Sequence, residues 1–305
     1  MASLWHAGSG RRSVIEAEHL VGRSDRASLR LEQDYVSTQH ALIRWNGQQW
    51  EVRDLGSRNG TFLDGVLMQP AKDHVLRSGM TLRFGDSNES WLLEDETPPQ
   101  VMAVRARDGA TVVMEGNILA LPSVQDPRAT LYRGTNGVWR LELTDESVAT
   151  IRNQQRFQID DDEWRFCCPQ LVVPTAGIII PREMRQLTLR FKVSTDEEHV
   201  ALGVHFDGTV VDLGSRNHNY LLLTLARERI ADRDRGLPDT GCGWIYQDKL
   251  LHALQISQIQ LNIDVFRIRK QFGSLGVVDA ASVVERRPRT KQLRVGTPCL
   301  VVDRD

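Results

Sequence analysis

The chain has 305 residues, of which 41% are hydrophobic and 26% are charged, and its formal net charge is -2. This length predicts two or three domains that each bury a core, and the near-balanced charge excludes an overall bias toward nucleic acid or membranes. No run approaches the roughly 18 apolar residues of a membrane span, and the first residues lack the apolar core of a signal peptide, so we expect a cytoplasmic protein with no membrane partner.

Cysteine spacing and proline-containing stretches set further limits. The four cysteines, at positions 167, 168, 242 and 299, show neither a disulfide framework nor metal-ligand spacing, so we expect reduced thiols, no metal and no cofactor. Stretches with several prolines or acidic residues at 94–100 and 169–184 indicate joints between domains. The predicted domains are 1–96, 101–170 and 185–305.

The first predicted domain carries short apolar runs separated by Gly, Asn and Asp turns, which favours antiparallel β-structure. Several motifs occur there in a fixed order: Gly22-Arg23, Ser37-Thr38-Gln39-His40, "WEVRDLGSRNGTFLDG", Gly79 and Phe84-Gly85-Asp86. This set resembles the forkhead-associated (FHA) family over about the first 96 residues. The resemblance implies an eleven-stranded β-sandwich whose loops at one end bind phosphothreonine peptides.

The resemblance also implies roles for single residues. By this resemblance, the residues that bind the phosphopeptide are Arg23, Ser37, Thr38, Arg58 and Asn59. The residues that support the loops are Gly22, His40 and Gly60. A phosphothreonine carries about -1.5 to -2 charges and three acceptor oxygens, so it requires guanidinium, hydroxyl and amide donors on preorganised loops. The segment has no paired carboxylates and no nucleophile beside a base, so we expect binding and no enzymatic activity.

The middle domain, 101–170, is a faint echo of the first and resembles a degenerate FHA-like module. It has no Gly-Arg pair, no S-x-x-H motif and no N-G loop before its final strands, so a phosphate would find no ligands there. We therefore predict a structural β-module. The acidic stretch at 160–163 lacks the glycine and distal glutamate of a calcium loop, which favours a solvated turn.

The third domain repeats the hexapeptide "DLGSRN" of residues 54–59 at residues 212–217. Here a helical pattern follows, so we expect Ser215 to cap a helix. Further helices are predicted within 244–254 and 257–272, followed by two strands around a basic turn within 280–296.

Strands, three helices and a hairpin in this order resemble the OmpR-type winged helix-turn-helix family across about 187–302. In that family the third helix enters the major groove and the wing contacts neighbouring DNA. The resemblance implies these DNA-binding candidates: Asn262, Arg267, Lys270, Arg286, Arg287, Arg289 and Lys291.

The third helix departs from that pattern. At 100° per residue Ile259, Ile263 and Phe266 lie near the face opposite the core stripe, although a DNA-reading face is usually more polar. This apolar face is suited to docking on the middle domain, on a second copy in a homo-oligomer, or on another protein.

Taken together, the sequence predicts a multidomain protein with an all-β FHA-type sandwich, a small β-rich middle module and an α+β winged helix domain. The leading functional hypothesis is a bacterial signalling regulator in which the FHA domain reads phosphothreonine made by a Ser/Thr kinase and the winged helix binds DNA to regulate transcription. The alternative is a phosphopeptide-dependent scaffold whose winged helix is a protein-protein interaction module.

Overall fold

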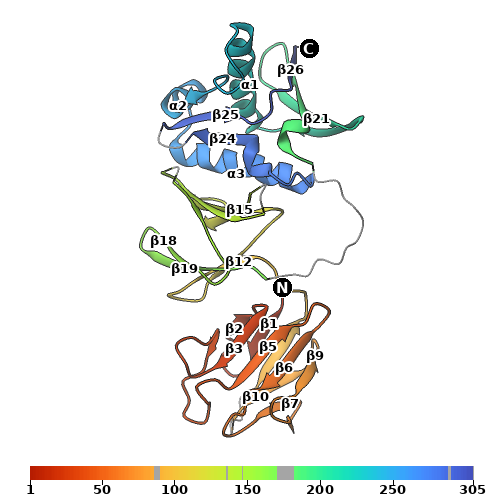
Figure 1. The fold of residues 1–305 in the computed structure, drawn as a ribbon, viewed down its shortest axis with the longest axis vertical. Helices are drawn as coiled ribbons and strands as arrows, with labels where there is room; N and C mark the ends of the chain where they lie inside the picture. The colour runs from red at the N-terminus through yellow and green to blue at the C-terminus, as the bar shows by residue number, and fades with distance from the viewer. Residues whose placement is uncertain (86–89, 135–136, 146, 170–181, 288–289, 305) are drawn as a thin grey trace. The chain divides into compact units, whose positions relative to one another are not determined.

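The structure is a computed structural model that describes residues 1–85, 90–134, 137–145, 147–169, 182–287 and 290–304 (Figure 1). The chain divides into two compact units. One comprises Met1–Val113 and Asn153–Ala176, and the other comprises Met114–Arg152 and Gly177–Asp305. The predicted middle domain therefore contributes strands to both units.

The first unit begins with two sheets of mostly antiparallel strands. They form an all-β FHA-type sandwich around one hydrophobic core. Alternation of buried and partly exposed residues explains the strands, since Trp50 and Val52 point into the core from the same strand. One sheet has the order β2-β1-β11-β10-β7-β8, and the other has the order β4-β3-β5-β6-β9. The strands are β1 (Ser3–His6), β2 (Arg12–Val14), β3 (Glu18–Gly22), β4 (Leu29–Arg30), β5 (Ala41–Trp45), β6 (Trp50–Asp54), β7 (Thr61–Leu63), β8 (Val66–Leu67), β9 (Asp73–Leu76), β10 (Thr81–Phe84) and β11 (Trp91–Asp95).

Two further four-stranded sheets follow, one in each unit. The first unit holds β13-β12-β19-β18 and the second holds β14-β15-β16-β17. These orders repeat the β2-β1-β11-β10 and β3-β5-β6-β9 orders of the preceding sandwich. The strands are β12 (Met102–Arg105), β13 (Thr111–Val113), β14 (Ile118–Pro122), β15 (Pro127–Arg133), β16 (Trp139–Leu143), β17 (Val148–Thr150), β18 (Arg156–Ile159) and β19 (Asp162–Cys167).

The rest of the second unit packs three helices against a sheet of order β22-β21-β20-β26, with a small β23-β25-β24 sheet beside them. Short 3-10 helices occupy Met184–Gln186 (η1) and Ala280–Val283 (η2). Among the described residues no helix is both long and apolar enough to cross a bilayer. The other elements are β20 (Thr188–Val193), β21 (Val200–Phe206), β22 (Thr209–Ser215), α1 (Asn219–Asp234), β23 (Ile245–Tyr246), α2 (Gln247–Leu254), α3 (Gln258–Ser274), β24 (Val284–Arg287), β25 (Gln292–Val295) and β26 (Leu300–Arg304).

The helices lie close to their predicted positions, but one predicted cap is wrong. Ser215 is the last residue of β22 and pairs with Ala201 in β21, whereas α1 begins at Asn219 after His218. Strand pairing thus carries the chain past the predicted cap. By contrast, Ser257 does cap α3, because its hydroxyl accepts from the Gln260 amide at 3.2 Å.

The two copies of the hexapeptide nevertheless share one local hydrogen bond. The Asp54 carboxylate accepts from the Gly56 amide at 2.8 Å, and the Asp212 carboxylate accepts from the Gly214 amide at the same distance. Both glycines have positive φ, at 78° and 70°, which suits the absence of a side chain. The repeated residues therefore form the same Asp-to-Gly hydrogen bond, although the first copy continues from Asp54 into the loop after β6 and the second runs to the end of β22 at Ser215.

Candidate functional site

Three loops at one end of the FHA-type sandwich meet around Ser37. The Arg23 amide, just after β3, donates to the Ser37 carbonyl at 3.0 Å. The Arg58 amide, in the loop between β6 and β7, donates to the Ser37 hydroxyl oxygen at 3.0 Å. The sequence-predicted Arg23, Ser37 and Arg58 are therefore brought together by contacts between their loops.

Gly22 allows the close approach of two of these loops. A Cβ at this position would lie 2.3 Å from the Thr38 carbonyl oxygen, a distance that only glycine avoids. The approach lets the Ser24 amide donate to the same oxygen at 3.1 Å. Thr38 itself is exposed, next to Ser37.

His40 connects two of the loops from a fully buried position. Its Nδ1 accepts from the Ser37 amide at 3.0 Å, and its Nε2 lies 3.0 Å from the Gly60 carbonyl oxygen. Because an amide can only donate, Nδ1 carries no proton and Nε2–H donates to Gly60. Burial lowers the pKa of His40 against the opposing effects of Gly60 and Asp54, which favours this neutral form.

Gly60 itself has a φ of 77°, and a Cβ there would lie 2.4 Å from a Leu67 methyl carbon.

Asp54 holds the loop that carries Arg58 and Asn59, and the sequence reasoning did not single it out. Its carboxylate accepts from the Gly56 amide at 2.8 Å, the Ser57 amide at 2.9 Å and the Ser57 hydroxyl at 2.6 Å. It also accepts from the Thr61 hydroxyl at 2.6 Å. Burial raises the pKa of Asp54, but these donors together hold it below its ordinary value. The Asp-x-Gly-Ser spacing of an Asx turn was the available signal.

The two arginine side chains of the site are exposed, and the ion pair that Arg23 forms is on the surface. The Arg23 guanidinium lies 3.6 Å from the Asp34 carboxylate, with side chains 47% and 102% exposed. Arg58 is exposed, and the Asn59 side-chain amide donates to the Tyr35 carbonyl at 2.9 Å. A surface ion pair of this kind contributes little stability, so an incoming dianion can replace Asp34 at low cost.

The candidate DNA-binding residues of the second unit fall into two groups. Arg267, Arg287 and Lys291 are exposed, and the Arg287 guanidinium lies 5.4 Å from the centre of the Trp244 ring. Arg289 lies outside the described residues. The remaining three side chains are held by other protein groups: Asn262, Lys270 and Arg286.

Those three contacts all involve α3 or β24. The Arg286 side chain is 9% exposed and lies 3.2 Å from the Glu142 carboxylate; it also donates to the Asn262 side-chain oxygen at 3.0 Å. Lys270 pairs with Glu115. Only part of the predicted set is therefore available to a ligand in this structure.

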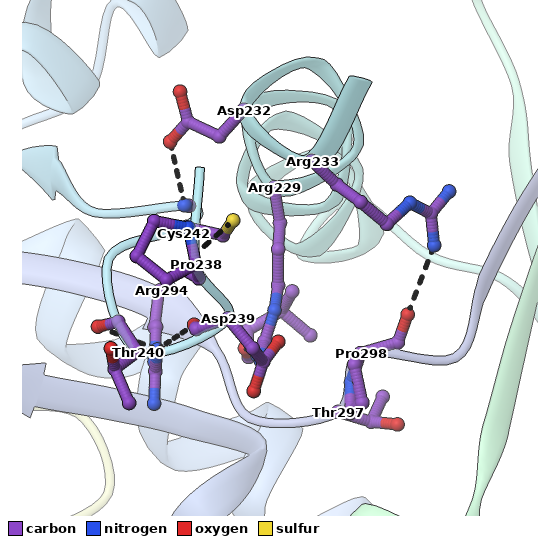
Figure 2. Close-up of polar contacts among 12 residues, drawn as sticks. Arg229, Asp232, Arg233, Pro238, Asp239, Thr240, Cys242, Arg294, Thr297 and Pro298 are labelled. Atoms are coloured by element: carbon purple, nitrogen blue, oxygen red, sulfur yellow. Dashed lines mark hydrogen bonds and ion pairs between the residues drawn. The ribbon is translucent and has the colours of Figure 1, made fainter. Parts of the chain in front are cut away.

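The connection between α1 and α2, residues 235–244, supports the β24–β25 hairpin (Figure 2). Arg229 of α1 donates to the Asp239 carboxylate at 2.7 Å and to the Val295 carbonyl at 2.5 Å. Arg294 of β25 donates to the Asp239 carbonyl at 3.1 Å, and the Gly243 amide donates to Asp232 at 2.8 Å. The length of this connection thus has a structural use, since it joins α1 to the hairpin.

The N-terminal part of the chain is similar in sequence to known FHA domains. Residues 19–85 match the model of the family described as FHA domain. FhaB of Mycobacterium tuberculosis is 48% identical over 54 residues, 18% of this chain and 35% of FhaB. FhaA of Mycobacterium tuberculosis is 37% identical over 81 residues, 26% of this chain and 15% of FhaA.

A solved structure from a study of phosphothreonine-dependent FHA domain interactions is 31% identical, covers 31% of this chain and 95% of that chain, and has a TM-score of 0.28. The chain spans about a third of the length of the FhaB relative that it matches. Residues 19–85 of this chain form an FHA domain.

Proposed function

We propose that the chain is a signalling protein that recognises phosphothreonine-containing partners, the products of a Ser/Thr kinase, through the loops around Ser37. The observation that carries the proposal is the convergence of Arg23 and Arg58 on Ser37, with both arginine side chains exposed. Thr38 and Asn59 complete the proposed site beside them.

The chemistry of the ligand fits these groups. Two guanidinium groups, a hydroxyl and loop amides match a phosphate that accepts several charged hydrogen bonds. Each such bond contributes about 1.5–3 kcal/mol, so phosphorylation can convert a weak peptide contact into a usable one. Gly22, His40 and Gly60 act on the loops and not on the phosphate.

Calorimetry with phosphothreonine peptides tests this proposal. Arg23→Ala should abolish measurable binding while the chain stays folded, because an exposed ligand is removed and no core contact is lost. Arg30→Ala is the matched control, since Arg30 is also exposed and pairs with a carboxylate, Glu32, at 3.5 Å. Parental affinity in a folded Arg23 variant would remove the basis of the assignment.

For the second unit we propose that the predicted winged helix serves as a protein-protein interaction module, so that the chain is a phosphopeptide-dependent scaffold. Phe266 and Arg269 of α3 are buried against the chain's own β14 and β16. A DNA-reading helix needs its outer face free, so this burial supports a protein contact and disfavours entry of that face into a DNA groove.

A second candidate is DNA binding and transcription regulation through the hairpin. The exposed Arg267, Arg287 and Lys291 favour it, because exposed cations near a hairpin suit phosphate contacts. Titration of the full chain with mixed-sequence duplex DNA at low salt separates the two candidates: the scaffold function predicts no binding, and the regulator function predicts binding that weakens with salt.

A further inference from the structure

The first unit contains a cleft of about 820 Å³ whose walls are rich in arginine. One wall belongs to the FHA-type sandwich and carries Arg11, before β2, and residues 25–30, in and after the loop that follows β3. The other wall belongs to β12, β18 and β19. Seven arginines and three carboxylates line this arginine cleft, which leaves an excess of four positive charges on its walls.

A buried ion pair fixes the two walls of the arginine cleft. Arg165 of β19 donates to the two carboxylate oxygens of Glu16 at 2.6 and 2.8 Å, and the Glu16 side chain is 6% exposed. The Gln154 side chain donates to the same carboxylate at 3.1 Å. Burial raises the pKa of Glu16, but the hydrogen bonds and charge of Arg165 hold it below its ordinary value. Arg165 therefore serves the architecture of the cleft and is not counted as a ligand contact.

Two arginines of the cleft have no carboxylate partner. Four of the others are paired on the surface: Arg30 with Glu32, Arg105 with Asp108, Arg107 with Asp162, and Arg156 with Glu163. By contrast, Arg11 and Arg26 are exposed, and neither forms an ion pair with any residue that the structure describes. The sandwich wall thus presents two guanidinium groups whose charge is available to a ligand.

The arginine cleft borders the loop that carries Arg23. Arg26 follows Arg23 by three residues, so the two Cα atoms lie at most about 11 Å apart. Farther along the chain, Arg30 of β4 pairs with Gly22 of β3, next to Arg23. A peptide with its phosphothreonine at Arg23 can therefore bring side chains three or more residues away to Arg26.

We propose that the arginine cleft is a second binding site for the phosphorylated partner. It takes an acidic stretch of Asp or Glu residues that lies at least three residues from the phosphothreonine, and Arg11 and Arg26 are its direct contacts. This inference rests on the proposed function of the FHA domain and specifies the chemistry of the partner. Carboxylates suit the cleft because guanidinium groups bind them in a bidentate geometry and the excess positive charge attracts them.

The charges of the cleft favour an acidic peptide over nucleic acid. Duplex DNA carries one negative charge per about 1.7 Å of its axis, so it cannot space its phosphates around fixed carboxylates. Asp25, Asp108 and Glu163 line the cleft among the arginines and would repel such a continuous row of charge. A peptide can place its acidic side chains opposite the arginines and neutral ones opposite these carboxylates.

Calorimetry of the full chain with three phosphothreonine peptides tests the proposal. One peptide carries a block of aspartates that begins three residues after the phosphothreonine, the second carries the same block before it, and the third has asparagines in both blocks. At low salt one acidic peptide should bind about ten-fold tighter than the asparagine peptide, and the gain should fall below about three-fold at about 0.5 M salt, because exposed charges are screened.

Two double variants locate the gain in affinity. Arg11→Ala with Arg26→Ala should abolish the gain and leave the affinity for the asparagine peptide within about two-fold of the parent, because the two arginines do not contact the phosphate. The matched control is Arg12→Ala with Arg77→Ala, which removes two exposed arginines of the same sandwich that do not line the cleft. This control should keep the gain.

The outcomes separate this inference from the function on which it rests. If none of the three peptides binds, the proposed phosphothreonine recognition is refuted and the second site falls with it. Equal binding of acidic and asparagine peptides refutes the second site alone. Loss of the gain in both double variants would show general charge attraction and overturn the assignment to the cleft. Binding of mixed-sequence duplex DNA by the parent and the control, but not by the variant lacking Arg11 and Arg26, would assign the cleft to nucleic acid instead.

Discussion

The substitution His40→Ala should destabilise the loops of the proposed phosphopeptide site, although it removes no group that contacts the phosphate. The side chain is fully buried and makes two hydrogen bonds, one from the Ser37 amide and one to the Gly60 carbonyl, each at 3.0 Å. A buried backbone group that loses its partner costs about 1–3 kcal/mol, so two such groups cost about 2–6 kcal/mol. Water entering the vacated space reduces this to about 2–4 kcal/mol.

Native-state hydrogen exchange measures this loss in the full chain. At 1.4 kcal/mol per factor of ten, a loss of about 2–4 kcal/mol accelerates exchange of the amides of β5 and β6 by about 30- to 700-fold. Phosphothreonine-peptide affinity should fall at least about ten-fold, because the loops bearing Ser37 and Arg58 lose their shared support. His252→Ala, an exposed change on α2, is the control. If exchange and affinity both stay at parental values, the role given to His40 is refuted.

Three other outcomes are expected. Gly22→Ala should weaken phosphopeptide binding by about 1–3 kcal/mol in calorimetry, because the new Cβ would meet the Thr38 carbonyl oxygen at 2.3 Å; unchanged affinity would contradict the close approach. Asp54 has a folded pKa below its ordinary value of 3.8, so its stabilisation of the loop is present above that pH and is lost as pH falls through the lowered pKa. The difference between Asp54→Asn and the parent in exchange rates should therefore shrink in acid, and a constant difference would refute this. If the hairpin contacts DNA, replacing both Arg287 and Lys291 with alanine should reduce the slope of log affinity against log salt by about 1.8, and an unchanged slope would exclude these contacts.

The meeting of the three loops around Ser37 was predictable because the motifs that form them are local and strongly constrained. A glycine before Arg23, a serine three residues before His40 and an Asn-Gly pair each fix one loop, and the structure brings those loops together around Ser37. The helices of the second unit were predictable from their apolar spacing. Asp54 was missed because it holds the loop through hydrogen bonds from Gly56, Ser57 and Thr61 and its side chain is no candidate ligand for a phosphate, although the Asp-x-Gly-Ser spacing indicated such a turn.

Long-range features were not predictable. Glu142 lies 127 residues from Arg269, and nothing local marks it as the partner of buried arginines. The cap assigned to Ser215 failed for a similar reason, since pairing with Ala201 decides where β22 ends. The apolar face of α3 was visible in the sequence, but its coverage by β14 needed the fold.

The division of the chain determines how it can be cut for experiments. The chain passes between its two units three times, after residues 113, 152 and 176, so no single cut separates them. A fragment of residues 185–305 would lack the β14–β17 sheet and would expose Phe266, Arg269 and Arg286 to solvent. Such a fragment would gain an apolar and basic surface that the whole chain buries. DNA retention by that fragment would therefore report an artefact of truncation and not the behaviour of the intact protein.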